Sequence, residues 1–153
     1  MNIHISSEDD MLNLGKKIGS ACSGGEFIEL IGDVGAGKTT FTKGLALGMG
    51  IKEEIQSPTF TISRIYDSDD NDLTLMHYDF YRLSDAGIMC SELNESASKK
   101  SAVVVVEWSD IVSNVLPKDR LIININYRAD DGRDVIITSN GNKSQKVMEA
   151  VKI

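Results

Sequence analysis

Helical and strand-like spacings of apolar residues alternate along the first 50 positions of the chain. Between residues 8 and 22 the apolar positions recur every three or four residues, which predicts a helix with one buried face. The run 27–31 is short, apolar and rich in residues that favour strands, so it predicts a buried strand. Helical spacing returns in 40–49, and Gly50 suits the left-handed residue that commonly closes a helix.

Strand-like patterns dominate the rest of the chain. The segment 60–66 predicts a strand, which the acidic turn 67–72 joins to a second strand over 73–78 as a hairpin. Residues 102–106 form an uninterrupted apolar run, which is typical of a central strand buried on both faces. A second hairpin and three short helices are expected from the remaining patterns. The hairpin strands are 121–126 and 134–138 around the turn 130–132, and the helices lie within 84–101, over 111–116 and at the C-terminus.

Residues 32–39 read Gly-Asp-Val-Gly-Ala-Gly-Lys-Thr and match the P-loop pattern at every fixed position. Glycines let such a loop curl so that successive N–H groups point at phosphate oxygens. Lys38 supplies charge to the outer phosphates, and the Thr39 hydroxyl can ligate Mg²⁺. The helix that follows adds partial positive charge at its N-terminus. The segment therefore predicts nucleotide binding, and the residues expected to contact the nucleotide are Asp33, Val34, Gly35, Ala36, Gly37, Lys38, Thr39 and Thr40.

Strand, glycine-rich loop and helix in this order predict an α/β fold of the P-loop NTPase type. We expect a mostly parallel central sheet with antiparallel hairpin additions and flanking helices. No internal repeat or linker divides the chain, so we expect a single nucleotide-binding domain over residues 1–153.

Two of the expected strands end in a carboxylate. Glu107 directly follows the apolar run 102–106, and Asp79 follows the strand 73–78. Because ligands of open α/β sheets bind at the carboxyl ends of strands, both acids are expected at the phosphate site, where they would hold Mg²⁺ or position water. The alternatives are a cap or turn residue at Glu107 and a salt bridge from Asp79 to Arg82.

Four further residues are candidates for the site. Ser57 and Thr59 flank Pro58, and their hydroxyls could sense the γ-phosphate or orient the attacking water, whereas a turn led by proline is the plain alternative. His77 is interpreted as a structural histidine rather than a general base. Trp108, the only tryptophan, is expected to wall the site or contact a partner, with core packing as the alternative.

Composition narrows the possible partners and compartment. The net charge of −7 argues against a direct grip on nucleic acid, which relies on Lys and Arg to neutralise phosphates. Cys22 and Cys90 are too few for a disulfide framework or a metal site and fit a reducing compartment. No apolar run approaches the length of a membrane span, and the N-terminus lacks a secretory pattern. We therefore expect a cytoplasmic protein that does not enter a membrane.

Four motifs together resemble the TsaE (YjeE) family. They are Gly-Asp-Val-Gly-Ala-Gly-Lys-Thr-Thr at 32–40, Ser-Pro-Thr-Phe-Thr at 57–61, His-Tyr-Asp-Phe-Tyr-Arg-Leu at 77–83 and Val-Glu-Trp-Ser at 106–109. They stand in the family's order and cover most of residues 28–109. The family is the bacterial ATPase component of the machinery that makes threonylcarbamoyladenosine in tRNA.

The resemblance implies that Lys38 contacts the phosphates of ATP and that Thr39 and Glu107 hold Mg²⁺. It further implies that Asp79 supports the metal or the attacking water, so that Lys38, Asp79 and Glu107 are the expected catalytic residues. Ser57 and Thr59 would act near the γ-phosphate. The implied partners are TsaB and TsaD, with ATP hydrolysis supporting turnover of the transferase and with tRNA contacted only indirectly.

Two other functions stay open from the sequence. The chain could be a small-molecule P-loop kinase, although its five arginines form no cluster that resembles a lid over the phosphates. It could also be a nucleotide-sensing binding module without useful hydrolysis, although Lys38, Thr39 and Glu107 are all present. Because no arginine finger stands out, we expect weak ATPase activity alone and stimulation by protein partners.

Overall fold

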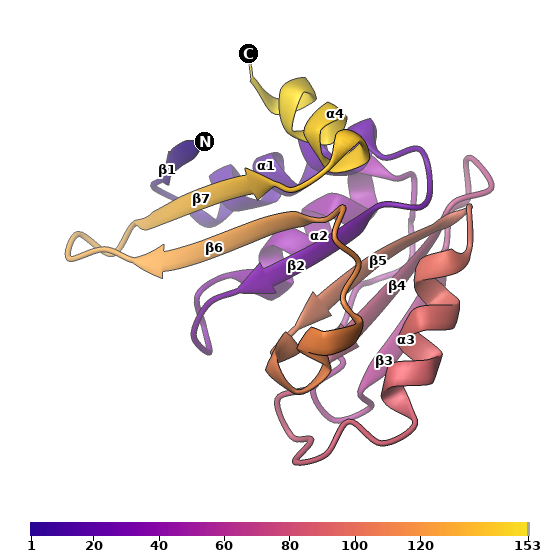
Figure 1. Ribbon diagram of the computed structural model, residues 1–153. Coiled ribbons are helices and arrows are strands. Elements are labelled where there is room, and N and C mark those ends of the chain that lie inside the picture. The colour runs from indigo at the N-terminus through magenta and orange to yellow at the C-terminus, as the bar shows by residue number, and fades with distance from the viewer. Residues whose placement is uncertain (153) are drawn as a thin grey trace.

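Seven strands form one sheet in the computed structural model, which describes residues 1–152 (Figure 1). Their order across the sheet is β1-β7-β6-β2-β5-β4-β3. The strands are β1 (Asn2–Ile5), β2 (Phe27–Ile31), β3 (Ser63–Asp67), β4 (Thr74–Asp79), β5 (Ala102–Glu107), β6 (Leu121–Tyr127) and β7 (Arg133–Ser139).

The four inner strands β6, β2, β5 and β4 run parallel to one another. Three antiparallel pairings add the outer strands: β6 with β7, β7 with β1, and β4 with β3. The expected α/β fold of the P-loop type, with a mostly parallel central sheet and antiparallel hairpin additions, is therefore confirmed. Both expected hairpins, β3–β4 and β6–β7, are present.

Helices cover the two faces of the sheet unequally (Figure 1). One core is shared by α1, α2 and α4, and the other by α3 and the 3-10 helix η1. The strand β5 serves both cores, because Val103 and Val105 point to the first and Val104 and Val106 to the second. The helices are α1 (Glu8–Ala21), α2 (Lys38–Gly48), α3 (Met89–Ser98), η1 (Ser109–Val115) and α4 (Asn142–Val151).

Glycines bring α1 and α2 into backbone contact. A methyl group at Gly15 or Gly19 of α1 would collide with the carbonyl oxygen of Phe41 or Leu45 in α2. The relationship is reciprocal, because a methyl group at Gly44 would collide with the carbonyl oxygen of Leu12 in α1. The P-loop helix is thus locked against α1 at a distance that only glycine permits.

The structure differs from the expected elements at two places. The strand expected over 60–66 begins only at Ser63, because the carbonyl of Pro58 accepts hydrogen bonds from the N–H groups of Thr61 and Ile62 and closes a turn. Ile62 has a φ of 69°, which a strand residue does not adopt. The strand β1 was not expected at all, since its four residues gain a partner only from β7 at the far end of the chain.

Within residues 1–152 no helix is both long and apolar enough to span a membrane.

Candidate functional site

The P-loop leaves the carboxyl end of β2 and enters α2. Gly35 and Gly37 have φ angles of 78° and 113°, in the left-handed region where glycine is favoured. Gly37 caps α2 without a side chain, so the loop backbone turns directly into the helix. The amides of the first helical turn therefore face the space above the sheet, where an anion is stabilised by the helix N-terminus.

Lys38, the first residue of α2, folds back under the loop. Its Nζ donates hydrogen bonds to the carbonyl oxygens of Gly32 at 2.6 Å and Asp33 at 2.9 Å. The same atom lies 4.0 Å from Oε2 of Glu107 and 5.0 Å from the centre of the Trp108 ring. Only 6% of Lys38 is exposed. Its ammonium group is thus held between the P-loop and the end of β5.

Asp79 and Glu107 end two neighbouring parallel strands and lie directly opposite each other in the register. Leu30 of β2 is the partner of Glu107 on its other side, so the P-loop leaves the sheet beside both acids. The side chains of Asp79 and Glu107 are both buried. The structure therefore brings together the two strand-end carboxylates that the sequence pattern singled out.

Both carboxylate oxygens of Asp79 are engaged. Oδ2 accepts a hydrogen bond from the Thr59 hydroxyl at 2.8 Å, and Oδ1 accepts one from the Tyr81 N–H at 2.9 Å. The hydroxyls of Thr59 and Ser57 are themselves 2.8 Å apart. Within residues 1–152 Asp79 forms no salt bridge to Arg82, whose guanidinium instead lies 4.3 Å from the centre of the Phe60 ring.

Glu107 is held by a histidine as well as by Lys38. The Nε2 of His77 lies 2.8 Å from Oε1 of Glu107, and both side chains are buried. Because an ionised carboxylate only accepts hydrogen bonds, Nε2 is assigned as the ring nitrogen that carries the proton. The interpretation of His77 as a structural histidine rather than a general base stays a prediction, and its polar contact is to a site residue.

Trp108 lies at the rim of the site in a strained conformation. Its φ of 54° is uncommon for a large residue. The ring packs against Tyr81 with a centroid distance of 4.8 Å and over Lys38. Partial burial and these contacts support the interpretation that Trp108 walls the site, and strain of this kind recurs at functional sites.

These elements enclose a cavity of about 580 Å³. Of the residues expected from the sequence, Asp33 and Ala36 do not line it. Its walls are formed by Val34, Gly35, Gly37, Lys38, Thr39, Thr40, Ser57, Thr59, Phe60, Asp79, Tyr81, Arg82, Glu107 and Trp108.

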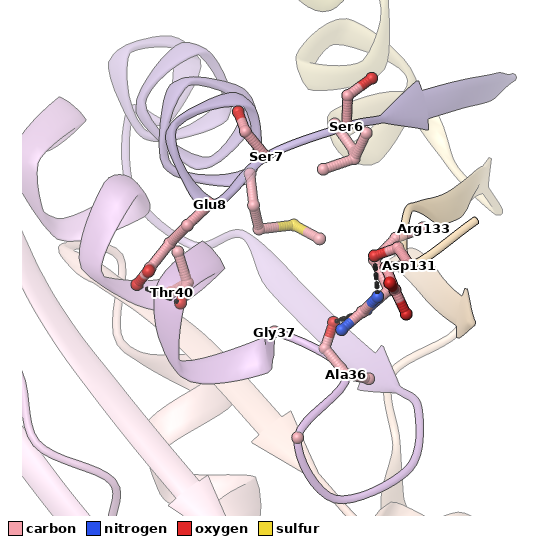
Figure 2. Close-up of a pocket in the computed structure, with 11 residues that line it drawn as sticks. Ser6, Ser7, Glu8, Ala36, Gly37, Thr40, Asp131 and Arg133 are labelled. Atoms are coloured by element: carbon pink, nitrogen blue, oxygen red, sulfur yellow. Dashed lines mark hydrogen bonds between the residues drawn. The ribbon is translucent and has the colours of Figure 1, made fainter. Parts of the chain in front are cut away.

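A second cavity of about 360 Å³ lies between the P-loop and the start of α1 (Figure 2). Gly35, Gly37 and Thr40 line both cavities, so the two adjoin at the P-loop. Glu8 accepts a hydrogen bond from the Thr40 hydroxyl at 3.2 Å, and Arg133 donates one from Nε to the carbonyl oxygen of Ala36 at 3.1 Å.

Outside the P-loop, the residues that line this second cavity were not found from the sequence. Glu8 stands in an ordinary acidic first turn of a helix, and Arg133 stands at the start of a hairpin strand. Tyr127 was also missed, although its hydroxyl donates to the carbonyl oxygen of Val34 at 2.9 Å and braces the P-loop. A single sequence carries no signal that these distant positions meet at one loop.

The donor set near the P-loop fits a hard cation. The Thr39 hydroxyl and the carboxylates of Asp79 and Glu107 line one cavity, and Mg²⁺ prefers oxygen donors. Within residues 1–152 no group of three or more His, Cys, Asp and Glu side chains forms a complete metal cage. Mg²⁺ at nucleotide sites is usually bound by one or two protein oxygens together with phosphates, so the set is sufficient.

Comparisons with known proteins identify a matching family, similar sequences and a similar structure. The family model described as "Threonylcarbamoyl adenosine biosynthesis protein TsaE" matches residues 5–135. A Bacillus subtilis protein named "tRNA threonylcarbamoyladenosine biosynthesis protein TsaE" is 40% identical over 126 residues, which are 82% of this chain and 77% of that protein. A Streptomyces coelicolor protein of the same name is 36% identical over 137 residues, which are 87% of this chain and 93% of its own.

The crystal structure of Bacillus subtilis YdiB superimposes with a TM-score of 0.82 and 32% identity. The match covers 99% of this chain and 93% of YdiB. The family model spans most of the chain, and these relatives exceed 30% identity, so sequence and fold both indicate the same family. The chain belongs to the TsaE family, which is described as acting in threonylcarbamoyladenosine biosynthesis.

Proposed function

We propose that this chain binds ATP with Mg²⁺ and hydrolyses it in support of threonylcarbamoyl transfer to adenosine in tRNA. The observation that carries the proposal is the position of Lys38, whose Nζ lies inside the P-loop and 4.0 Å from the Glu107 carboxylate. A phosphate-binding cation and a metal-binding acid in one cavity are the two groups that phosphoryl transfer requires. The names of the relatives supply the pathway.

ATP would span the two adjoining cavities. Its phosphates would lie against the P-loop amides in the larger cavity, with Lys38 turning from the carbonyls of Gly32 and Asp33 to the phosphate oxygens. Its base would enter the cavity lined by Glu8 and Arg133 (Figure 2). The shared border at Gly35, Gly37 and Thr40 is what supports this placement.

Thr39 and Glu107 would hold Mg²⁺, which when bound neutralises charge on the β- and γ-phosphates. Residues of the chain would stabilise the transferred phosphoryl group and orient the attacking water. Lys38 would offset charge that develops on the transferred phosphoryl group. Asp79 holds the Thr59 hydroxyl in the cavity, where it is placed to orient the attacking water.

Partners of the TsaB and TsaD type would complete the site. Phe60 is 81% exposed and Tyr81 is 51% exposed, and both stand at the rim of the phosphate cavity. Exposed aromatic residues at the mouth of a site favour coverage by another protein. We therefore propose weak hydrolysis by the chain alone and stimulation by these partners. We also propose that the chain forms one domain and that it acts in the cytoplasm.

The test is Mg²⁺-dependent ATP hydrolysis by the purified chain, alone and with TsaB and TsaD added. We expect a low basal rate, a strong increase with both partners, and loss of both rates in Lys38→Ala. A rate that the partners leave unchanged would contradict the proposal. Transfer of the phosphoryl group to an added metabolite would instead identify a kinase, and binding without turnover in any mixture would identify a sensor.

A further inference from the structure

The pair of His77 and Glu107 is buried on the α2 side of the sheet. His77 and Asp79 alternate with Met76 and Tyr78 of β4 and with Phe80 directly after it, and these three face the core under α3. The side chain of His77 is completely buried, and its Nε2 lies 2.8 Å from Oε1 of Glu107. The imidazole therefore approaches Glu107 from beneath the phosphate cavity, on the side away from solvent.

His77 has one polar partner among the described residues. Its Nδ1 is buried without a hydrogen bond within residues 1–152, which leaves an unpaired acceptor. An unpaired buried polar group destabilises the fold, a cost that an apolar side chain of similar size would not carry. The hydrogen bond to Glu107 is thus the one polar contribution of this residue.

The two oxygens of Glu107 face different groups. Oε1 contacts His77, and Oε2 lies 4.0 Å from Nζ of Lys38 on the P-loop side. The last torsion of a glutamate side chain is broad and poorly fixed by itself. A hydrogen bond to one oxygen from a rigid ring in the core sets the plane of the carboxylate and keeps the other oxygen directed at the P-loop.

We propose that His77 is a positioning residue that orients the Glu107 carboxylate for Mg²⁺ in the nucleotide complex. The inference rests on the proposed role of Glu107 as a metal-binding residue. Hydrogen-bond partners of metal-binding side chains fix their orientation, and removing such a partner typically lowers metal affinity about 10–100-fold. Loss of His77 should therefore weaken the contribution of Mg²⁺ to nucleotide binding without weakening nucleotide binding in general.

The experiment measures the affinity for a non-hydrolysable ATP analogue at saturating Mg²⁺ and again in EDTA, by the fluorescence of Trp108. The ratio of the two dissociation constants is the gain that Mg²⁺ provides, and hydrolysis plays no part in it. We expect His77→Leu to reduce this gain about tenfold or more while the constant in EDTA stays unchanged. If His77 only supported the fold, its loss would change the dissociation constants with Mg²⁺ and in EDTA by the same factor, or would change neither.

Two amide variants separate positioning from packing. The Nε2 of glutamine can take the place of the histidine Nε2, whereas the shorter asparagine places its amide where Nδ1 stands. We expect His77→Gln to restore most of the gain from Mg²⁺ and His77→Asn to restore little. Equal gains in these two variants would overturn the proposal, and this comparison holds even if His77→Leu fails to fold.

Tyr78→Phe is the matched control. Tyr78 points to the opposite face of β4 from His77, away from the phosphate cavity. There its hydroxyl forms a buried hydrogen bond of 2.7 Å with the hydroxyl of Ser96 in α3. The variant loses a buried hydrogen bond from β4, as His77→Leu does, and should keep the full gain from Mg²⁺. A reduced gain in Tyr78→Phe would mean that β4 stability, not Glu107 orientation, determines the effect, which would overturn the proposal.

Glu107→Gln distinguishes failure of this inference from failure of the proposed metal role. If Glu107→Gln loses the gain from Mg²⁺ but His77→Leu keeps it, Glu107 binds metal without help and the positioning role is wrong. If Glu107→Gln keeps the gain from Mg²⁺, Glu107 does not bind the metal, and the positioning role of His77 is wrong as well. The double variant His77→Leu/Glu107→Gln should lose no more than Glu107→Gln alone.

Discussion

The hydroxyl of Thr59 donates a hydrogen bond to Oδ2 of Asp79 at 2.8 Å and ties the turn after Pro58 to the end of β4. The sequence left open whether Asp79 acts on the metal or on the attacking water. Both of its oxygens already accept hydrogen bonds, from Thr59 and from the Tyr81 N–H. This arrangement favours the role in which Asp79 holds a hydroxyl in place over the P-loop.

Thr59→Val should therefore slow hydrolysis more than it weakens binding. The substitution keeps the shape of the side chain and removes the hydroxyl that Asp79 holds. A lost hydrogen bond of about 1–1.5 kcal/mol in the transition state corresponds to roughly a tenfold lower turnover. The measurement is kcat with TsaB and TsaD present, beside the dissociation constant for the ATP analogue. Thr61→Val, an exposed threonine in the same turn, should leave both constants unchanged.

The cavity at the start of α1 gives a prediction about the base of the nucleotide. Glu8→Ala removes a carboxylate that lines this cavity and contacts Thr40 (Figure 2). We expect ATP to bind roughly tenfold more weakly, as for the loss of one hydrogen bond of about 1.4 kcal/mol. Inorganic tripolyphosphate, which has no base, should bind as before.

Asp9→Ala is the control for Glu8→Ala, because both acids lie in the first turn of α1 but only Glu8 lines the cavity. Equal weakening of ATP and tripolyphosphate by Glu8→Ala would show that the substitution disturbs the P-loop rather than a base site. No change with either ligand would remove Glu8 from the site.

The parts of the site that the sequence predicted are those with a local signature. The P-loop is a contiguous motif, and Asp79 and Glu107 each end an apolar run, so the rule that ligands bind at the carboxyl ends of parallel strands was enough to bring them together. The Asp79–Glu107 register itself was not predictable, because it depends on the pairing of β4 with β5 across the intervening α3.

The parts that the sequence missed depend on contacts between distant segments. Glu8 and Arg133 come from opposite ends of the chain and meet only because β1 pairs with β7. β1 itself has four residues, too few for a periodic pattern. Phe60 and Ile62 were wrongly placed in a strand because their apolar character outweighed the turn that Pro58 closes.

The close contact between α1 and α2 predicts that one added methyl group at Gly19 strongly destabilises the fold. In Gly19→Ala the new carbon would collide with the Leu45 carbonyl, and the backbone on both sides is helical and cannot yield easily. Overpacking of this kind costs about 1–3 kcal/mol, which lowers Tm by roughly 3–10 °C in a domain of this size. Thermal unfolding checks the value. Lys17→Ala, at an exposed position of α1, should shift Tm by no more than about 1–2 °C, and a similar small shift in Gly19→Ala would show that the helices can separate without cost.

Asp119 should make stability depend on pH, because it caps a helix that cannot cap itself. The N-cap residue of α4 is Gly141, which has no side chain, and the Asp119 carboxylate instead accepts hydrogen bonds from the N–H groups of Lys143 at 2.9 Å and Ser144 at 3.0 Å. Desolvation acts to raise the pKa of the Asp119 carboxyl, but the hydrogen bonds from Ser144 and Lys143 outweigh it and hold the pKa below its ordinary value.

A carboxyl whose pKa is lower in the folded state stabilises the fold above its unfolded pKa of about 3.9, and this stabilisation is lost as pH falls through the folded value. The free energy of unfolding of Asp119→Asn should therefore be about 1 kcal/mol below that of the parent chain at pH 7, and the difference should shrink below about pH 4. Urea unfolding from pH 7 to pH 3 measures it. Lys143→Met keeps the backbone amide and removes only the Lys143 charge, which lowers the Asp119 pKa less than the hydrogen bonds do, so its curve should retain most of the parent's dependence on pH from this cap. A difference between Asp119→Asn and the parent that stays constant down to pH 3 would mean that the carboxylate charge contributes nothing to capping α4.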